Sequence, residues 1–202
     1  MAKTFWDKAA GIYHRFMKKD EAAYAQMLAY MRPIVRDKTV LELATGTGDI
    51  AKQLVCAAAM IEATDASPQM IAEARKGQAS AKLHFSVQDM FHLPYANQSF
   101  DVVIVSNALH IVPEPEKALD EIRRVLRSNG VLITPTFVHA QNNLRARFRA
   151  FLMRRVGFPL HSKWSNASYL RFLRENGWTI EKNILLSASF PLAYVECRKT
   201  VE

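Results

Sequence analysis

A short stretch of the chain, residues 39–49, combines a buried-strand pattern with a carboxylate and two closely spaced glycines. It reads Thr-Val-Leu-Glu-Leu-Ala-Thr-Gly-Thr-Gly-Asp, and Val40 begins the apolar run of a strand that is buried on both faces. Gly46 and Gly48 allow the backbone to approach a ligand that a Cβ atom would hold away. The helix expected at 48–57 would direct free N–H groups and the positive end of its dipole into the turn. The pattern predicts a nucleotide-cofactor loop.

Glu42 discriminates between the two kinds of cofactor that use such a turn. Gly46, Gly48 and Ala51 satisfy the dinucleotide pattern G-x-G-x-x-G/A. However, a pyrophosphate at this helix N-terminus would be repelled by Glu42, which stands four residues before Gly46. A carboxylate at that position suits an ammonium or sulfonium group, so an NAD-dependent reductase is disfavoured.

Residues 42–48, Glu-Leu-Ala-Thr-Gly-Thr-Gly, resemble motif I (E/D-x-G-x-G-x-G) of the class I S-adenosylmethionine-dependent methyltransferases. Within that family they look most like methyltransferase type 11, the ubiquinone and menaquinone biosynthesis kind. Ala44 replaces the first glycine, a variant that is also seen in that group. The resemblance covers roughly residues 38–137 and implies S-adenosyl-L-methionine as cofactor and S-adenosyl-L-homocysteine as product.

The resemblance also implies which residues bind the cofactor. Asp65 would accept both ribose hydroxyls, while Asp89 and the backbone amide of Met90 would bind the adenine. Met70 falls where a side chain could cover the adenine, although a methionine at such a position is more often a core residue. Simple turn, loop or capping roles stay open for the acidic residues and for the polar pair after the fourth strand. The expected cofactor-binding residues are Tyr13, Glu42, Ala44, Thr45, Gly46, Gly48, Asp65, Ala66, Met70, Asp89, Met90, Ser106 and Asn107.

The reaction that the resemblance implies is an in-line displacement, in which the sulfonium methyl group passes to a nucleophile held behind it. Asn107 and His110 follow the fourth expected strand, whose end lies beside the transferred methyl group in the family. His110 is the first choice as a general base and His139 the second, because histidine titrates near neutral pH. A packing or capping role for His110 is equally open, and a carbanion or thiolate acceptor would need neither histidine. A cofactor-binding protein without transferase activity is the non-enzymatic alternative.

Apolar runs alternate with helical patterns along the chain, which is typical of an α/β fold. We predict a Rossmann-like, doubly wound, seven-stranded sheet that is mostly parallel, with a C-terminal antiparallel hairpin and helices on both faces. Ligands bind such sheets at the carboxyl ends of the strands, next to the point where the strand order reverses. The expected strands are 39–44, 60–65, 82–87, 101–106, 130–136, 178–187 and 190–198, and the expected helices are 48–57, 68–77, 115–127 and 165–177.

Length and composition predict one methyltransferase domain over residues 1–202, half of which are hydrophobic. By resemblance, Tyr13 would lie in a lid that closes over the methionine end of the cofactor. The expected parts are N-terminal lid helices at 1–35, a cofactor-binding core at 38–137, a substrate-cap insertion at 138–164, and the last helix with the terminal hairpin at 165–202.

The cysteines and the N-terminal composition predict a cytoplasmic protein. Cys56 and Cys197 are far apart in sequence and lack metal-ligand spacing, so we expect two buried, reduced thiols and no metal site. The longest apolar run, 102–112, is interrupted by polar residues and is too short to span a bilayer. Asp7 and Asp20 argue against a transit peptide in the first twenty residues.

Residues 141–155 bear on the methyl acceptor, because apolar residues fall on one helical face and arginines occupy the others. The apolar face could roof a pocket for a hydrophobic small molecule. The same helix could lie on an anionic membrane and collect a lipid or quinone precursor. It could also bind nucleic-acid phosphates, which the net charge of +8 favours. A solvated arginine face without a partner is the fourth alternative.

The residues after the fourth expected strand weigh against nucleic-acid and protein acceptors. Enzymes that methylate base amino groups or protein amides usually carry an Asn/Asp-Pro-Pro-aromatic turn there, whereas this chain has Ser106-Asn-Ala-Leu. We therefore expect a small hydrophobic, aromatic or quinone-like acceptor, with lipid, RNA and protein as the alternatives.

Overall fold

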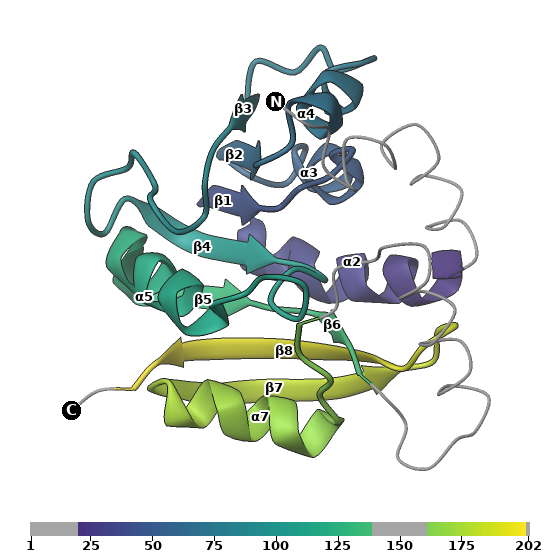
Figure 1. Ribbon diagram of the computed structural model, residues 1–202. Coiled ribbons are helices and arrows are strands. Elements are labelled where there is room, and N and C mark those ends of the chain that lie inside the picture. Colours follow the sequence, from purple (N-terminus) through teal and green to yellow (C-terminus); the bar gives the residue numbers. More distant parts are fainter. Residues whose placement is uncertain (1–19, 139–160, 201–202) are drawn as a thin grey trace.

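The computed structural model describes residues 20–138 and 161–200, which form a single mixed sheet covered by helices (Figure 1). The expected alternation of strands and helices is confirmed, with boundaries that differ by a few residues. The elements are α2 (Glu21–Val35), β1 (Thr39–Leu43), α3 (Asp49–Leu54), β2 (Met60–Asp65), α4 (Pro68–Ala74), β3 (Leu83–Val87), β4 (Phe100–Val105), α5 (Pro115–Val125), β5 (Leu126–Ile133), β6 (Thr136–Phe137), α7 (Asn166–Glu175), β7 (Trp178–Leu186) and β8 (Leu192–Lys199).

The sheet has the predicted doubly wound topology. Its strands follow the order β3-β2-β1-β4-β5-β8, with β7 paired to the other edge of β8. The five strands β1 to β5 are parallel to one another, whereas β8 is antiparallel to both β5 and β7. The strand order therefore reverses between β1 and β4, and this is the point at which α/β sheets bind ligands.

The sheet contains eight strands, one more than predicted, because the fifth expected strand is interrupted. Ile133 of β5 pairs with Glu196 of β8, and Thr136 of β6 continues the same register by pairing with Ala193. Pro135 lies between them and has no N–H to donate to a neighbouring strand. Because β5 and β6 pair with β8 in one register, they are a single strand that is interrupted at Pro135. This strand also begins at Leu126, where the prediction still had helix.

Two apolar cores lie on the two faces of the sheet, which explains why the strands read as continuous apolar runs. On β4, Val102 and Ile104 face the core beneath α2, α3 and α4. Val103 and Val105 face the core beneath α5 and α7 (Figure 1). Because side chains on both faces of β4 are packed in a core, the position of the loop that follows its carboxyl end is well fixed.

Helix α2 is the described part of the predicted N-terminal lid, and it packs firmly on the sheet. Its buried residues recur at helical spacing and are Ala23, Tyr24, Met27, Leu28, Met31 and Val35. Among the described residues, no helix is both long and apolar enough to cross a membrane.

The expectation of two buried thiols is correct for Cys197 and wrong for Cys56. Cys197 lies on β8 inside the sheet, whereas Cys56 lies in the turn that follows α3 and is exposed.

Candidate functional site

The glycine-rich loop after β1 has a left-handed backbone at three positions. The φ angles are 52° at Ala44, 57° at Gly46 and 76° at Gly48. At Gly48 a Cβ atom would lie 2.6 Å from Cζ of Phe85, so packing as well as backbone angle requires glycine there. At Ala44 an L-residue adopts an angle that costs about 1–2 kcal/mol, and such strain is typical of ligand-binding loops.

Asp65, at the carboxyl end of β2, holds this loop in place. Its Oδ2 accepts a hydrogen bond from the Gly46 amide at 2.9 Å, and its Oδ1 accepts one from the Ser67 amide at 2.8 Å. Thr45 N donates to Thr64 O at 2.8 Å, which ties the loop to β2 a second time. Because a carboxylate offers about four acceptor positions, Asp65 keeps acceptor capacity toward a ligand.

Glu42 is a buried carboxyl group at the carboxyl end of β1, with only 2% of its surface exposed. Burial, together with the smaller effect of the negative charges of Asp49 and Asp65, raises the pKa of Glu42 to about 8. The nearby Thr45 hydroxyl and Ala51 amide lower this pKa but do not outweigh the burial. At neutral pH the carboxyl group is therefore mostly protonated.

Three buried oxygens at this site lack a hydrogen-bond partner within residues 20–138 and 161–200. They are Glu42 Oε2, Thr45 Oγ1 and Ser106 Oγ. Buried polar atoms are rarely left unpaired, because each such atom costs about 1–3 kcal/mol. Three of them in one place therefore point to a ligand that carries hydrogen-bonding groups.

The three oxygens belong to residues that line one pocket at the point where the strand order reverses. The pocket is lined by Tyr24, Glu42, Ala44, Thr45, Asp49, Ile50, Ser106 and Asn107. Five of the predicted cofactor residues are thus brought together, from the end of β1, the glycine-rich loop and the end of β4.

Asn107 is fixed in a left-handed conformation, with φ of 53°, by contacts with three segments. Its backbone N–H donates to Pro135 O at 2.8 Å, and its Oδ1 accepts from the Phe137 amide at 3.1 Å. Its Nδ2 donates to the Tyr24 hydroxyl on α2 at 2.8 Å. The sequence reasoning missed Tyr24, because the helical spacing of α2 marks it only as a core residue.

The residues predicted to surround the adenine lie after β2 and β3. Asp89 Oδ1 accepts from the Phe91 amide at 2.9 Å, while the side chain is 56% exposed and close to His92. Met90 is half-buried, Ala66 is exposed, and Met70 is fully buried with 2% exposure. The packed position of Met70 agrees with a core role.

An ion pair on α5 supports the loop that follows Asp89. Arg124 donates from Nη2 to Leu93 O at 3.0 Å and from Nη1 to Tyr95 O at 2.7 Å. Glu121, which pairs with Arg124 at 2.8 Å, accepts the Leu93 amide through Oε2 at 3.0 Å. The two side chains therefore fix residues 93–95 to the helix behind them.

His110 lies in the loop after β4 and is 7% exposed. Its Nδ1 is 2.9 Å from Thr136 Oγ1, and its carbonyl oxygen accepts from the amides of His161 and Ser162, each at 3.0 Å. The ring is thus engaged with β6, and the chain from residue 161 onward returns to the same loop. Tyr13 and His139 lie outside the described residues.

Residues 41–134 match the family model described as "Methyltransferase domain". The demethylmenaquinone methyltransferase of Renibacterium salmoninarum is 31% identical over 153 residues, which are 74% of this chain and 64% of that protein. The matched residues, 41–134, therefore form a methyltransferase domain. The whole chain spans less than two thirds of the length of this curated relative.

Two solved structures have a fold similar to that of this chain. One is a putative methyltransferase solved in complex with the Haloferax volcanii Trm112 methyltransferase activator, with a TM-score of 0.85, 19% identity and full coverage of both chains. The other is DhpI in complex with SAH, with a TM-score of 0.77, 23% identity, and coverage of 98% of this chain and 95% of that one. At these identities the similarity establishes the methyltransferase fold.

Residues 20–138 and 161–200 contain no group of three or more His, Cys, Asp or Glu side chains that could hold a metal ion. The polar groups at the site are instead carboxyls, hydroxyls and an amide, which are suited to binding an organic cofactor.

Proposed function

We propose that this chain transfers the methyl group of S-adenosylmethionine to a small apolar acceptor at the carboxyl ends of β1 and β4. The observation that carries the proposal is the set of unpartnered buried oxygens of Glu42, Thr45 and Ser106 in one pocket beside the glycine-rich loop. An ammonium group can donate a hydrogen bond to each of these oxygens, and its positive charge favours the ionised form of Glu42. The ionised carboxylate would repel a pyrophosphate.

The residues at the site fit this cofactor. Glu42 and its neighbours would hold the amino acid end, and the remaining acceptor positions of Asp65 would hold the ribose hydroxyls. Asp89 and the Met90 amide would bind the adenine. Tyr13 stays a predicted contact of the methionine end. When bound, the cofactor supplies an electrophilic methyl group, so the protein itself needs mainly to bind and to align.

Alignment of the two reactants accounts for most of the proposed acceleration. Holding two reacting groups in line can supply about 7–11 kcal/mol. Asn107 is suited to such a role, because the Pro135 carbonyl, the Phe137 amide and the Tyr24 hydroxyl fix its position. When His110 Nδ1 donates to Thr136, the other ring nitrogen Nε2 is the basic one, and His110 is then the proposed proton acceptor.

We propose a quinone-type or similar apolar ring as the acceptor. A relative that is 31% identical is named a demethylmenaquinone methyltransferase. Residues 139–160 lie outside the described residues, but the residues on either side of them lie next to the proposed methyl position. Before them, the Phe137 amide donates to Asn107 Oδ1. After them, the amides of His161 and Ser162 donate to the His110 carbonyl oxygen. This placement supports the substrate-cap role proposed for residues 138–164.

Isothermal titration with S-adenosylmethionine, S-adenosylhomocysteine and NAD tests the cofactor. We expect micromolar binding of both sulfur ligands, as is common for enzyme ligands, and no binding of NAD. Binding of NAD alone would overturn the proposal. A screen of apolar quinols, phenols, thiols and amines with radiolabelled cofactor would then identify the acceptor. Cofactor binding without transfer to any of these acceptors would favour the non-enzymatic alternative.

His110→Asn is expected to lower kcat by about 10²–10⁴-fold if the acceptor must lose a proton. The dissociation constant of the cofactor should stay unchanged, because His110 does not line the cofactor pocket. His84→Asn is the matched control, since His84 is exposed and pairs with Glu62 on the edge of the sheet. Full turnover by the His110 variant would exclude base catalysis by this residue.

Arg124→Met is expected to weaken cofactor binding about fivefold, because the loop next to Asp89 loses the charge-assisted hydrogen bonds that fix it. kcat at saturating cofactor should change little, since Arg124 lies behind the loop and does not line the cofactor pocket. The control is Arg171→Met on the exposed face of α7. Equal cofactor affinities of the two variants would refute the supporting role of Arg124.

A further inference from the structure

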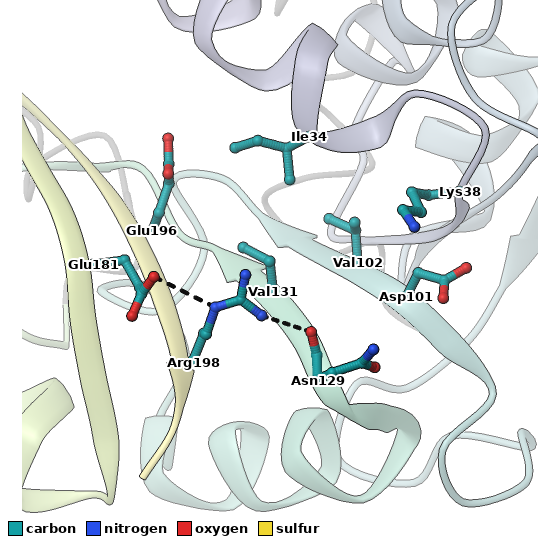
Figure 2. A pocket seen from close by; sticks show the side chains of 9 residues that line it. All are labelled: Ile34, Lys38, Asp101, Val102, Asn129, Val131, Glu181, Glu196 and Arg198. Carbon is teal, nitrogen blue, oxygen red and sulfur yellow. Dashed lines mark hydrogen bonds and ion pairs between the residues drawn. The ribbon is translucent and has the colours of Figure 1, made fainter.

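A second hollow, of about 440 Å³, lies at the opposite end of the sheet from the methyl-transfer site (Figure 2). Asp101 and Val102 begin β4 and line this hollow, whereas Ser106 and Asn107 follow the other end of the same strand. At about 3.3 Å per residue, the two places are roughly 15 Å apart. The hollow is lined by Ile34, Lys38, Asp101, Val102, Asn129, Val131, Glu181, Glu196 and Arg198.

Each carboxylate in the wall of this hollow already has a cationic partner. Asp101 pairs with Arg127 at 2.5 Å, Glu181 with Arg198 at 3.4 Å, and Glu196 with Lys182 at 3.2 Å. Asp101 also accepts the Thr39 amide, and Glu196 accepts the Tyr194 hydroxyl. The acidic side of the wall is therefore neutralised from within the protein.

Lys38 provides the charge that remains in this count, and its charge also lowers the pKa of Asp101 in the same wall. Its ammonium group has no ion pair or hydrogen bond among the residues that the structure describes, and its side chain is exposed. Arg198 uses Nε for Glu181 and Nη1 for Asn129 O, at 2.6 Å, so Nη2 has no hydrogen bond within the same part of the chain. The group of paired charges plus Lys38 carries one net positive charge.

The space between the two cations is apolar. Figure 2 shows Lys38 and Arg198 on opposite sides of the hollow, with Val102 and Val131 between them and Ile34 of α2 above. Val102 is buried, while Ile34 and Val131 keep part of their surface exposed to the hollow. The hollow thus offers apolar contact in the middle and hydrogen-bond donors at its sides.

We propose that this hollow is a binding site for a small monocarboxylate with an apolar body. A single negative charge on the ligand equals the one net positive charge of this group. A phosphate dianion would carry more negative charge than the group can neutralise, and the three carboxylates of the wall would repel it. A hydrocarbon or aromatic body fills the space over Val102, Val131 and Ile34. The volume lies within the usual range of small-ligand pockets, about 300–1,000 Å³. This site is independent of the methyl-transfer proposal.

Benzoate is a suitable probe, and benzamide, benzylamine and phenyl phosphate are matched comparisons of the same ring. We expect benzoate to cause saturable NMR shifts of the Ile34, Val102 and Val131 methyl groups in the full chain. Its affinity should exceed that of each comparison about fivefold, the factor for one partly exposed charge contact. Shifts that do not saturate, or equal binding of benzamide, would overturn the proposal. Tighter binding of benzylamine or phenyl phosphate would also overturn it.

Two variants and one control locate the site. Lys38→Met should weaken benzoate binding about fivefold by removal of the charge contact, and Val131→Trp should abolish it by filling the hollow. Lys117→Met is the control, because Lys117 is an exposed lysine of α5 that pairs with Glu114. If neither Lys38→Met nor Val131→Trp changed the affinity, or if the shifts appeared at Ser106 and Asn107 instead, the hollow would not be the binding site. Neither outcome depends on methyl transfer.

Discussion

Binding of S-adenosylmethionine is expected to release nearly one proton at pH 7, and Glu42→Gln is expected to abolish that release. In the ligand-free chain, burial raises the pKa of Glu42 to about 8, so the carboxyl group is mostly protonated at pH 7. An ammonium group beside it favours the ionised form, and the proton leaves when the ligand binds. Below pH 8 the apparent affinity should therefore rise up to about tenfold per pH unit. Titration calorimetry in buffers of different ionisation enthalpy counts the protons.

A control variant and a contradicting result can be stated for this measurement of proton release. Asp49→Asn removes a neighbouring charge that raises the pKa of Glu42, so this variant should release slightly less than the wild type. The pH range should end below about 7.7, where the α-amino group of the ligand begins to titrate. A wild-type affinity that is flat from pH 6 to pH 7.5, with no proton released, would show that Glu42 does not face the ammonium group.

The same pKa predicts how the stability of the ligand-free chain depends on pH. An acid whose pKa is raised by folding binds more protons in the folded state, so the free energy of unfolding falls as pH rises from about 4.5 and levels off above about 8. A shift of this size corresponds to on the order of 5 kcal/mol. Glu42→Gln should therefore melt at a higher temperature than the wild type at pH 8 and at a similar temperature at pH 5. The buried carboxyl group of Glu42 thus reduces stability at neutral and alkaline pH.

The Gly48→Ala variant is expected to lose about 3 kcal/mol of the free energy of unfolding. The backbone at Gly48 has φ of +76°, and an added Cβ would lie 2.6 Å from Phe85 Cζ and 3.2 Å from Ala74 Cβ. The left-handed backbone costs an L-residue about 1–2 kcal/mol, and overpacking costs about 1–3 kcal/mol more. Urea denaturation measures the loss. Cofactor binding should weaken too, because relief of the contact moves the loop.

Gly77→Ala separates the two costs of the Gly48 substitution. Gly77 has a similar φ of +67°, but an added Cβ would have nothing within 4 Å. Gly77→Ala should therefore show only the backbone cost. Phe85→Leu combined with Gly48→Ala should recover part of the difference, as expected for residues in contact. Equal losses in the two single alanine variants would show that Phe85 does not restrict the loop.

The fold and the glycine-rich loop were predictable because they depend on local patterns. Buried strands read as apolar runs, and Glu42, Gly46 and Gly48 lie close together in sequence. The break at Pro135 was not predicted, because the pairing of Thr136 with Ala193 bridges a long sequence separation. Leu126 was predicted to be helical, because its extended conformation depends on pairing with Phe100 of β4, which is also distant in sequence.

Residues of the candidate site were predictable only where a local sequence pattern marks them. Glu42 was singled out because a carboxylate in a buried strand is unusual, and the structure places it in the pocket with Ser106 and Asn107. Tyr24 has no such signal, since its hydroxyl meets Asn107 only after α2 has packed on the sheet. The support of the loop after Asp89 by Arg124 was also missed, because arginines at helix ends are common and their acceptors are remote in sequence.

The position of β8 constrains the order in which this protein folds. β8 is formed by residues 192–199, yet it lies between β5 and β7 and closes the pairing of both. During synthesis, β1 to β5 emerge well before β8. They can pair with one another, but the outer edge of β5 stays open until residues 192–199 have been made. Such an edge is a template for pairing with other chains, so the pairing of β8 with β5 removes a site of aggregation.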